Sequence, residues 1–177
     1  MKEEKTYYGN DVVYLSFMTA AEYNSTSNSH ATSVHCFPIK DNQILFTKNP
    51  RGVDIIGGHV EKGETPEQAL IREAKEEACI ELEKFELIGA VRVDNRDNPK
   101  AIEKGYPEIG YQLFYKSEKF KTLDFEQTHE CTGRIYLRKA DIKEKHHKWL
   151  ETHQEILVEM EKGCFKKKIN KRYTQKI

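Results

Sequence analysis

One short helix with clear start signals, set between runs of strand-forming residues, constrains the fold of this chain most strongly. Thr65 can cap the helix, Pro66 fits its first turn, and Gln68 completes a capping box three residues after Thr65. The spacing predicts a helix to about Ala78. Its predicted apolar stripe consists of Leu70, Ile71, Ala74 and Ala78. Because strand patterns precede and follow this helix, the sequence predicts an α/β fold with a mixed sheet covered by helices.

The strand patterns occupy residues 12–18, 34–39, 44–47, 85–93, 111–116 and 134–138. The second and third form a hairpin around residues 40–43, and Pro38 is expected to weaken the first arm or to place a bulge there. Polar stretches at residues 23–33 and 94–110 are predicted to be loops, and the second is long enough to suggest a functional or mobile segment. A final helix is expected at residues 143–162, with Trp149, Ile156 and Met160 near one face. We therefore divide the chain into an N-terminal extension (1–30), one domain (31–163) and a basic tail (164–177).

Charge and composition exclude several classes of protein. The 177 residues carry 29 basic and 29 acidic side chains, so overall charge gives no reason to expect binding to nucleic acid or to an anionic membrane. The apolar runs are far shorter than the ~20 residues of a membrane span, and the N-terminus lacks a secretory signal pattern. Four separated cysteines without a C-x-x-C pair favour reduced thiols. These features predict a cytoplasmic protein.

Three glutamates on the predicted helix form the most informative cluster. Glu73, Glu76 and Glu77 have the spacing i, i+3 and i+4, which brings their carboxylates to one face of a helix. Like charges at this spacing repel, and Arg72 offsets only part of the repulsion. Hard divalent cations such as Mg²⁺ prefer oxygen ligands of this kind. A solvated acidic face on a structural protein is the alternative for these charges taken alone.

Glycines precede the same helix. Gly57, Gly58 and Gly63 predict a tight loop, in which exposed backbone groups could contact a metal or a phosphate. A carboxylate cluster beside such a loop favours metal-assisted phosphoryl chemistry with an activated water.

Spacing over residues 58–80 resembles the Nudix box of the Nudix hydrolases. Gly58 is followed by Glu64 after five residues, and the pair Arg72-Glu73 follows after seven more. The pair Glu76-Glu77 completes the charged positions. The resemblance implies a Nudix-like α/β/α sandwich, with a mixed sheet and flanking helices. It also implies hydrolysis of a diphosphate linkage in a nucleoside diphosphate derivative, such as a nucleoside triphosphate, a nucleotide sugar or a dinucleoside polyphosphate.

The resemblance further assigns roles to residues. Glu76 and Glu77 would bind Mg²⁺ or Mn²⁺, Glu73 would be a ligand or the general base, and the carbonyl of Gly57 a further ligand. A salt bridge between Glu64 and Arg72 would orient the helix. An acid outside the box often completes the site, and Glu130 is our candidate, in competition with Glu126, Glu108 and Asp97. Lys48, Arg51 and Gly58 are the candidates for substrate contacts, and Arg92 and Arg96 are further candidates for phosphate contacts. Ordinary surface charge is the alternative for these four cations.

Two positions depart from the family pattern. Cys79 stands where the pattern has Gly, which often ends a helix with positive φ, so we expect a changed helix exit. Ile56 stands where many members have Pro, so the loop is expected to be less rigid. These departures motivate a second hypothesis, a Nudix-fold nucleotide-binding module with weak or lost catalysis.

Other site classes find little support in the sequence. His146, His147 and His153 lack the H-E-x-x-H arrangement, so no zinc site is expected. The expected partner is a small-molecule nucleotide, not a membrane or a nucleic acid. The substrate within this class, the number of metal ions and the choice between monomer and homodimer stay open.

Overall fold

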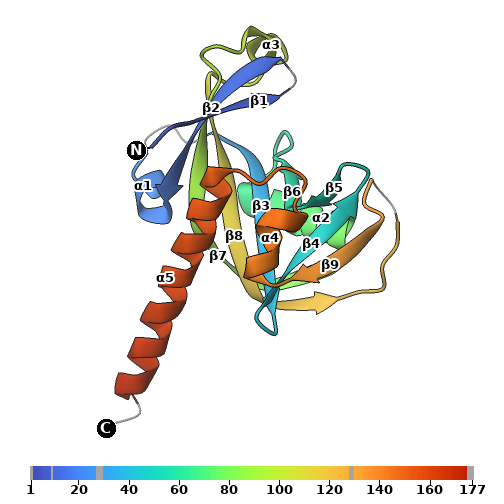
Figure 1. Ribbon diagram of the computed structural model, residues 1–177, viewed down its shortest axis with the longest axis vertical. Helices are drawn as coiled ribbons and strands as arrows, with labels where there is room; N and C mark the ends of the chain where they lie inside the picture. Colours follow the sequence, from blue (N-terminus) through green and yellow to red (C-terminus); the bar gives the residue numbers. More distant parts are fainter. Residues whose placement is uncertain (1, 9, 27–29, 128–129, 175–177) are drawn as a thin grey trace.

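The computed structural model describes residues 2–8, 10–26, 30–127 and 130–174, with side chains described up to residue 162, except that of Tyr8. Within these ranges the chain forms nine strands and five helices (Figure 1). The strands are β1 (Glu4–Tyr8), β2 (Asp11–Thr19), β3 (Ala31–Lys40), β4 (Gln43–Asn49), β5 (Gly52–Asp54), β6 (Ile56–His59), β7 (Ile80–Asp94), β8 (Ile109–Thr122) and β9 (Gly133–Leu137). The helices are α1 (Ala20–Asn24), α2 (Pro66–Ala78), α3 (Pro99–Glu103), α4 (Lys139–Lys145) and α5 (Glu151–Thr174).

A mixed sheet organises the molecule. Its strand order is β1-β2-β7-β8-β3-β4-β5, with β6 also paired to β3 and β9 to β4. Strands β3 and β8 run parallel, and the other strand pairs described are antiparallel. The predicted α/β fold with a mixed sheet and flanking helices is therefore confirmed.

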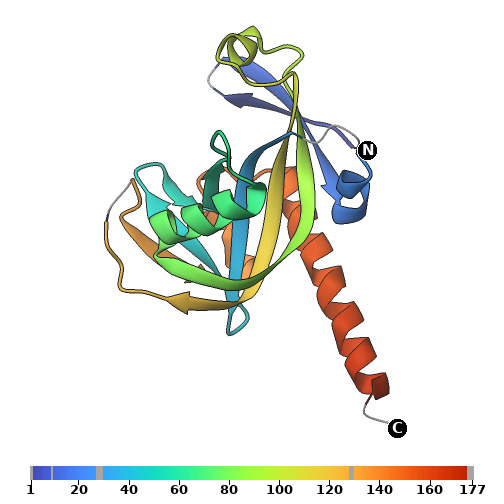
Figure 2. The ribbon, with the colours of Figure 1, turned by 180° about the vertical axis from the view of Figure 1, so that it is seen from behind.

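Helices cover the two faces of this sheet (Figures 1 and 2). On one face, α2 buries an apolar cluster that includes Leu70, Val34 and Leu113. On the other face, α4 and α5 pack Ile142, Ile156 and neighbouring side chains against the sheet. The candidate site described below takes residues from α2, β5, β6 and the α4–α5 connection.

The predicted hairpin forms between β3 and β4. Its two turn residues, Asp41 and Asn42, both have positive φ (50° and 61°), as the two-residue turn that matches strand twist requires. Strand β3 continues through Pro38, which pairs with Ser117, and its irregularity lies instead between Ala31 and Ser33. The expectation of a weakened or bulged strand at Pro38 was therefore wrong.

Several local expectations need correction. The polar stretch 23–33 was predicted to be a loop, but α1 extends into it as far as Asn24, and β3 begins at Ala31. The segment 94–110 contains α3, which Asn98 caps by accepting a hydrogen bond from the Ala101 amide. In both places short polar side chains cap a helical turn, which competes with an irregular loop.

The predicted final helix is divided in two. Helix α4 ends at Lys145, and α5 begins at Glu151, so Trp149 lies between the helices and not on the face of one. Helix α5 also extends to Thr174, through much of the segment predicted as a basic tail, while residues 175–177 lie outside the described part.

Helix α2 has the predicted start and end. Thr65 and Gln68 form the capping box. Ile71, however, is exposed, and Ala69 takes its predicted place in the apolar stripe. No helix in the described ranges is long and apolar enough to cross a membrane.

Cys79 ends α2 with φ 48° and ψ 52°, the left-handed conformation that glycine usually adopts. The expected change of helix exit was therefore wrong. Arg134 explains how the exit is kept, since its guanidinium donates hydrogen bonds to the carbonyls of Ala78 (2.8 Å) and Cys79 (3.1 Å). The Cys79 thiol is buried, and its Sγ accepts a hydrogen bond from the Glu126 amide at 3.4 Å. These contacts offset the cost of a left-handed non-glycine residue, roughly 1 kcal/mol.

Candidate functional site

Gly57 and Gly58 bring a strand close to the acidic helix. They lie in β6, paired with β3, and not in the loop that the sequence predicted. A Cβ on Gly57 would lie 2.1 Å from the Val34 carbonyl oxygen, and Gly57 has φ +151°. A Cβ on Gly58 would lie 2.2 Å from Oε1 of Glu73. Both glycines are therefore needed for close approach, the second of them to the carboxylate of Glu73.

Arg72 connects three of the box glutamates. Its guanidinium forms two hydrogen bonds with Glu64, at 2.8 and 3.0 Å, so the salt bridge suggested by the sequence is present. Nη1 also lies 2.7 Å from Oε1 of Glu73 and 3.2 Å from Oε2 of Glu76. A further bond to the carbonyl of His59 ties α2 to the end of β6. One cation thus fixes the helix and two of its carboxylates relative to the glycine strand.

Glu77 lies on the same helix without a salt bridge in the described structure. Its Oε2 accepts a hydrogen bond from the backbone N–H of Gly57 at 2.9 Å. Burial raises the pKa of Glu77 to about 7, and the charges of Glu73 and Asp54 act in the same direction, while the Gly57 amide and the charge of Arg51 oppose them. The positive charge of Arg51 therefore compensates this carboxylate only in part.

A cavity of about 710 Å³ opens beside these groups. Its lining includes Gly57, Gly58, Glu73, Glu77 and Glu130. Asp54, Glu61, Arg51, Lys148 and several histidines also line it. The carboxylates in this lining outnumber Arg51 and Lys148, so the donor set fits a hard divalent cation.

The other predicted residues lie in different places. Glu64 and Glu76 pair with Arg72 outside the lining of this cavity, and the side chain of Glu76 is 36% exposed. Among the four acids proposed outside the box, Glu130 is the one that lines the cavity. Of the predicted substrate contacts, Arg51 lines the cavity and pairs with Asp54 at 3.4 Å, whereas Lys48 is exposed on β4 outside the lining.

Sequence reasoning missed two groups of residues. Asp54 and the histidines of the cavity come from β3, β5, β6, the α4–α5 connection and α5, so no local spacing could associate them. A second cavity of about 420 Å³ adjoins the first and shares Ser33, His59 and Gln112 with it. Its own lining includes Tyr106, from the segment whose length had suggested a function.

Comparison with known proteins supports the box assignment. The NUDIX domain family matches residues 29–158, most of the chain. No curated protein matches the sequence.

Solved structures share the fold. A mutant of the Bacillus subtilis pyrophosphohydrolase BsRppH has 19% identity and a TM-score of 0.65, over 92% of this chain and 98% of that one. The NUDIX domain of Shewanella oneidensis NrtR, solved with ADP ribose, has 15% identity and a TM-score of 0.53, over 83% and 99%. MutT from Aliivibrio salmonicida and Vibrio cholerae has 18% identity and a TM-score of 0.52, over 73% of this chain and 98% of that one. With the domain match and the geometry of the box, they show that this chain belongs to the Nudix family of hydrolases, which cleave phosphoric anhydride bonds.

Proposed function

We propose that this protein is a Mg²⁺-dependent pyrophosphohydrolase that cleaves a diphosphate linkage in a nucleoside diphosphate derivative. The observation that carries the proposal is that Glu73, Glu77 and Glu130 line one cavity together with Gly57 and Gly58. Carboxylates and glycine backbone around one space suit a cation and the phosphates that it would hold. Mn²⁺ is the alternative ion.

The adjoining cavity supports a nucleotide as the substrate. Its volume falls in the usual range for small-molecule sites, and its wall combines the aromatic Tyr106 with amides from Asn95, Asn98 and Gln112. An aromatic ring and amide groups can stack on a base and hydrogen-bond to its edge. Since the two cavities share part of their lining, a base in one can lie beside phosphates in the other.

In this proposal each side chain has a definite task. Glu77, Glu130 and the Gly57 carbonyl would hold the ion, Glu76 would join them from its position beside Arg72, and Glu73 would be a further ligand or accept the proton of the attacking water. When bound, Mg²⁺ neutralises charge on the phosphates and lowers the pKa of a water. Arg72 acts through other groups, because it holds Glu73 and Glu76 in place while Glu64 anchors it.

A substrate panel with matched variants tests this function. Purified protein is incubated with nucleoside triphosphates, nucleotide sugars, dinucleoside polyphosphates and ADP-ribose, with Mg²⁺ or Mn²⁺, and phosphate is measured after phosphatase treatment. We expect turnover of at least one compound, its loss with EDTA, and a fall of about 100-fold or more in Glu77→Gln. Glu144→Gln, which changes an exposed carboxylate on α4, is the control and should keep wild-type turnover. Turnover that survives EDTA or Glu77→Gln would refute the assignment.

The alternative function, a nucleotide-binding module, gives a different result in the same panel. It predicts ligand binding by calorimetry without turnover of any compound. Two of its motivations were the Cys79 and Ile56 departures, and the first is weakened because α2 keeps the left-handed exit. A cytoplasmic location and the choice between monomer and homodimer stay predictions.

A further inference from the structure

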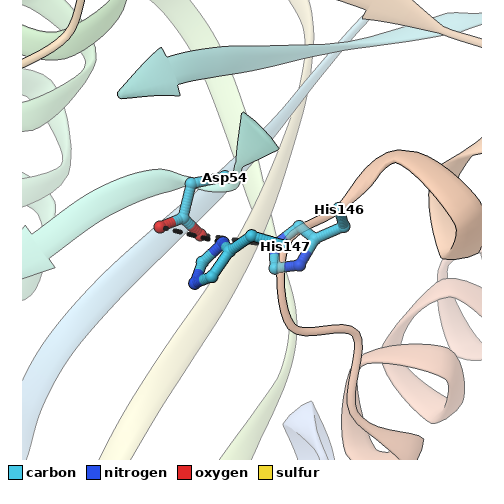
Figure 3. Close-up of side chains that lie close together, drawn as sticks. All are labelled: Asp54, His146 and His147. Atoms are coloured by element: carbon cyan, nitrogen blue, oxygen red, sulfur yellow. Dashed lines mark ion pairs between the residues drawn. The ribbon is translucent and has the colours of Figure 1, made fainter. Parts of the chain in front are cut away.

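A second cluster of ligand-type side chains lies in the cavity opposite the acidic helix. Asp54 ends β5, and His146 and His147 follow α4. A bridge between Val53 and His146, and a hydrogen bond from the His147 amide to the Val53 carbonyl (3.1 Å), hold the two segments together. Figure 3 shows the Asp54 carboxylate facing the two imidazole rings. Segments about ninety residues apart thus contribute to one cluster.

Nε2 of the buried His146 imidazole forms no full hydrogen bond among the described residues. The side chain is 2% exposed, and Nε2 lies 3.2 Å from Oδ1 of Asp54, an ion-pair contact. Buried polar atoms are rarely left without a partner, so this one calls for an explanation.

The spacing of the cluster fits a metal ion. The nearest atoms of Asp54 and His147, Oδ2 and Nδ1, are 3.7 Å apart, and one ligand atom from each of the three residues lies within 4.8 Å of the others. Tetrahedral zinc with bonds of about 2.0–2.1 Å separates its ligand atoms by about 3.3–3.4 Å. The contacts of Asp54 with His146 (3.2 Å) and with His147 (3.7 Å) are close to these values, and ligand atoms that lie up to 4.8 Å apart would have to move closer together around an ion.

We propose that Asp54, His146 and His147 form a binding site for a nitrogen-preferring divalent transition metal, with Zn²⁺ as the expected ion. Two imidazoles and one carboxylate suit zinc, whereas Mg²⁺ selects oxygen ligands. Asp54 and His147 are 22% and 25% exposed, so the ion can enter from the cavity and keep one position open to it. Such a site goes beyond the proposed hydrolase function and does not depend on it.

Metal binding requires three existing contacts to change. Nδ1 of His147 donates a hydrogen bond to the Val53 carbonyl at 3.2 Å, and an ion on this nitrogen would displace that bond and leave the proton on Nε2. Nδ1 of His146 accepts a hydrogen bond from the Lys148 amide at 3.1 Å. A neutral imidazole has one lone pair, so an ion on Nε2 moves the proton to Nδ1 and displaces the Lys148 N–H. Arg51, which lies 3.4 Å from Asp54, must also turn away, and its largely exposed side chain leaves it free to do so. The lost Lys148 bond provides a specific signature of binding.

Cobalt substitution tests the site and separates it from the carboxylate helix. Co²⁺ is added to metal-free protein with Mg²⁺ in excess, and visible absorption and calorimetry report binding, with Zn²⁺ as competitor. We expect a cobalt spectrum of nitrogen coordination that Zn²⁺ abolishes. His147→Ala and Asp54→Asn should weaken binding by about tenfold or more, whereas His59→Ala, a histidine of the same cavity outside the cluster, should bind as wild type. Glu77→Gln should also retain the signal, and thermal melting confirms that each variant is folded.

Amide NMR supplies a second measurement that does not need a variant. Zn²⁺ should shift the Lys148 amide resonance and speed its hydrogen exchange, because the bond to His146 is broken. The proposal is overturned if wild-type protein gives no nitrogen-type cobalt spectrum, or if the signal disappears in Glu77→Gln and persists in His147→Ala. An unchanged Lys148 amide in zinc-saturated protein would also overturn it.

Discussion

Replacing Glu77 by glutamine should stabilise the metal-free protein above neutral pH. The carboxyl of Glu77 is buried, and its pKa is raised to about 7 from an ordinary value of 4.5. The folded state therefore binds this proton more tightly than the unfolded state, and stability falls as the pH rises from 4.5 to about 7. The full difference is about 3 kcal/mol, from the shift multiplied by about 1.4 kcal/mol per pKa unit. Glutamine lacks the charge but can still accept the hydrogen bond from Gly57.

Thermal melting in EDTA measures this effect as a difference between variant and wild type. At pH 8 we expect Glu77→Gln to raise Tm by about 6–12 °C, and at pH 4.5 to change it little. The Tm difference between variant and wild type is needed because His35 and His153 change stability with pH in the opposite direction to Glu77. Burial lowers their pKa values to about 4 and about 3, so their contribution to stability increases as the pH rises towards 6.5. Both proteins share these histidines, and their effect cancels in the subtraction.

Glu76→Gln is the matched control. Its carboxylate lies on the same helix but is more exposed and pairs with Arg72, so its removal should not raise Tm at pH 8. Added Mg²⁺ should reverse the order of stability, because an ion bound by Glu77 stabilises the wild type. A Glu77→Gln protein that melts below wild type at pH 8 in EDTA would refute the idea that the buried charge of Glu77 destabilises the metal-free protein.

Three further substitutions test the scaffold of the site. Arg72→Ala should lower kcat/KM by about 100-fold while Tm falls by only about 2–4 °C, since Arg72 positions ligands more than it supports the core. Unchanged turnover would remove that role. Cys79→Gly should be about 1 kcal/mol more stable than Cys79→Ala in urea unfolding, because both variants lose the thiol and only glycine adopts a φ of 48° without steric strain. Equal stability of the two variants would contradict the idea that residue 79 is strained. Gly58→Ala should displace Glu73 and lower turnover by about 100-fold. Gly133→Ala is the control, because its added Cβ would lie 3.9 Å from the nearest atom, and its turnover should stay within about twofold of wild type. Equal activities of the two variants would contradict the close approach of Gly58 to Glu73.

Local signals in the sequence were sufficient for helix α2 and for the hairpin of β3 and β4. The capping pair of Thr65 and Gln68 and the turn residues Asp41 and Asn42 act through bonds and dihedral angles of a few consecutive residues. The charged spacing of the box also lies within one segment, and its resemblance to the family's box implied the salt bridge between Glu64 and Arg72 without coordinates. Interactions of this range are encoded locally and need no knowledge of the rest of the fold.

The sequence alone determined the helix, its acidic face and the family resemblance, whereas the tertiary structure decided what surrounds them. Arg134 reaches the end of α2 from β9, which lets Cys79 keep a conformation that local propensity disfavours. Asp54 and His146 meet because β5 and the α4–α5 connection pack together, although about ninety residues separate them. The pKa of Glu77 likewise depends on burial against β6 and on charges from other segments. Spacing along a chain sets which side chains share a face of one element, but only packing between elements sets their burial and partners.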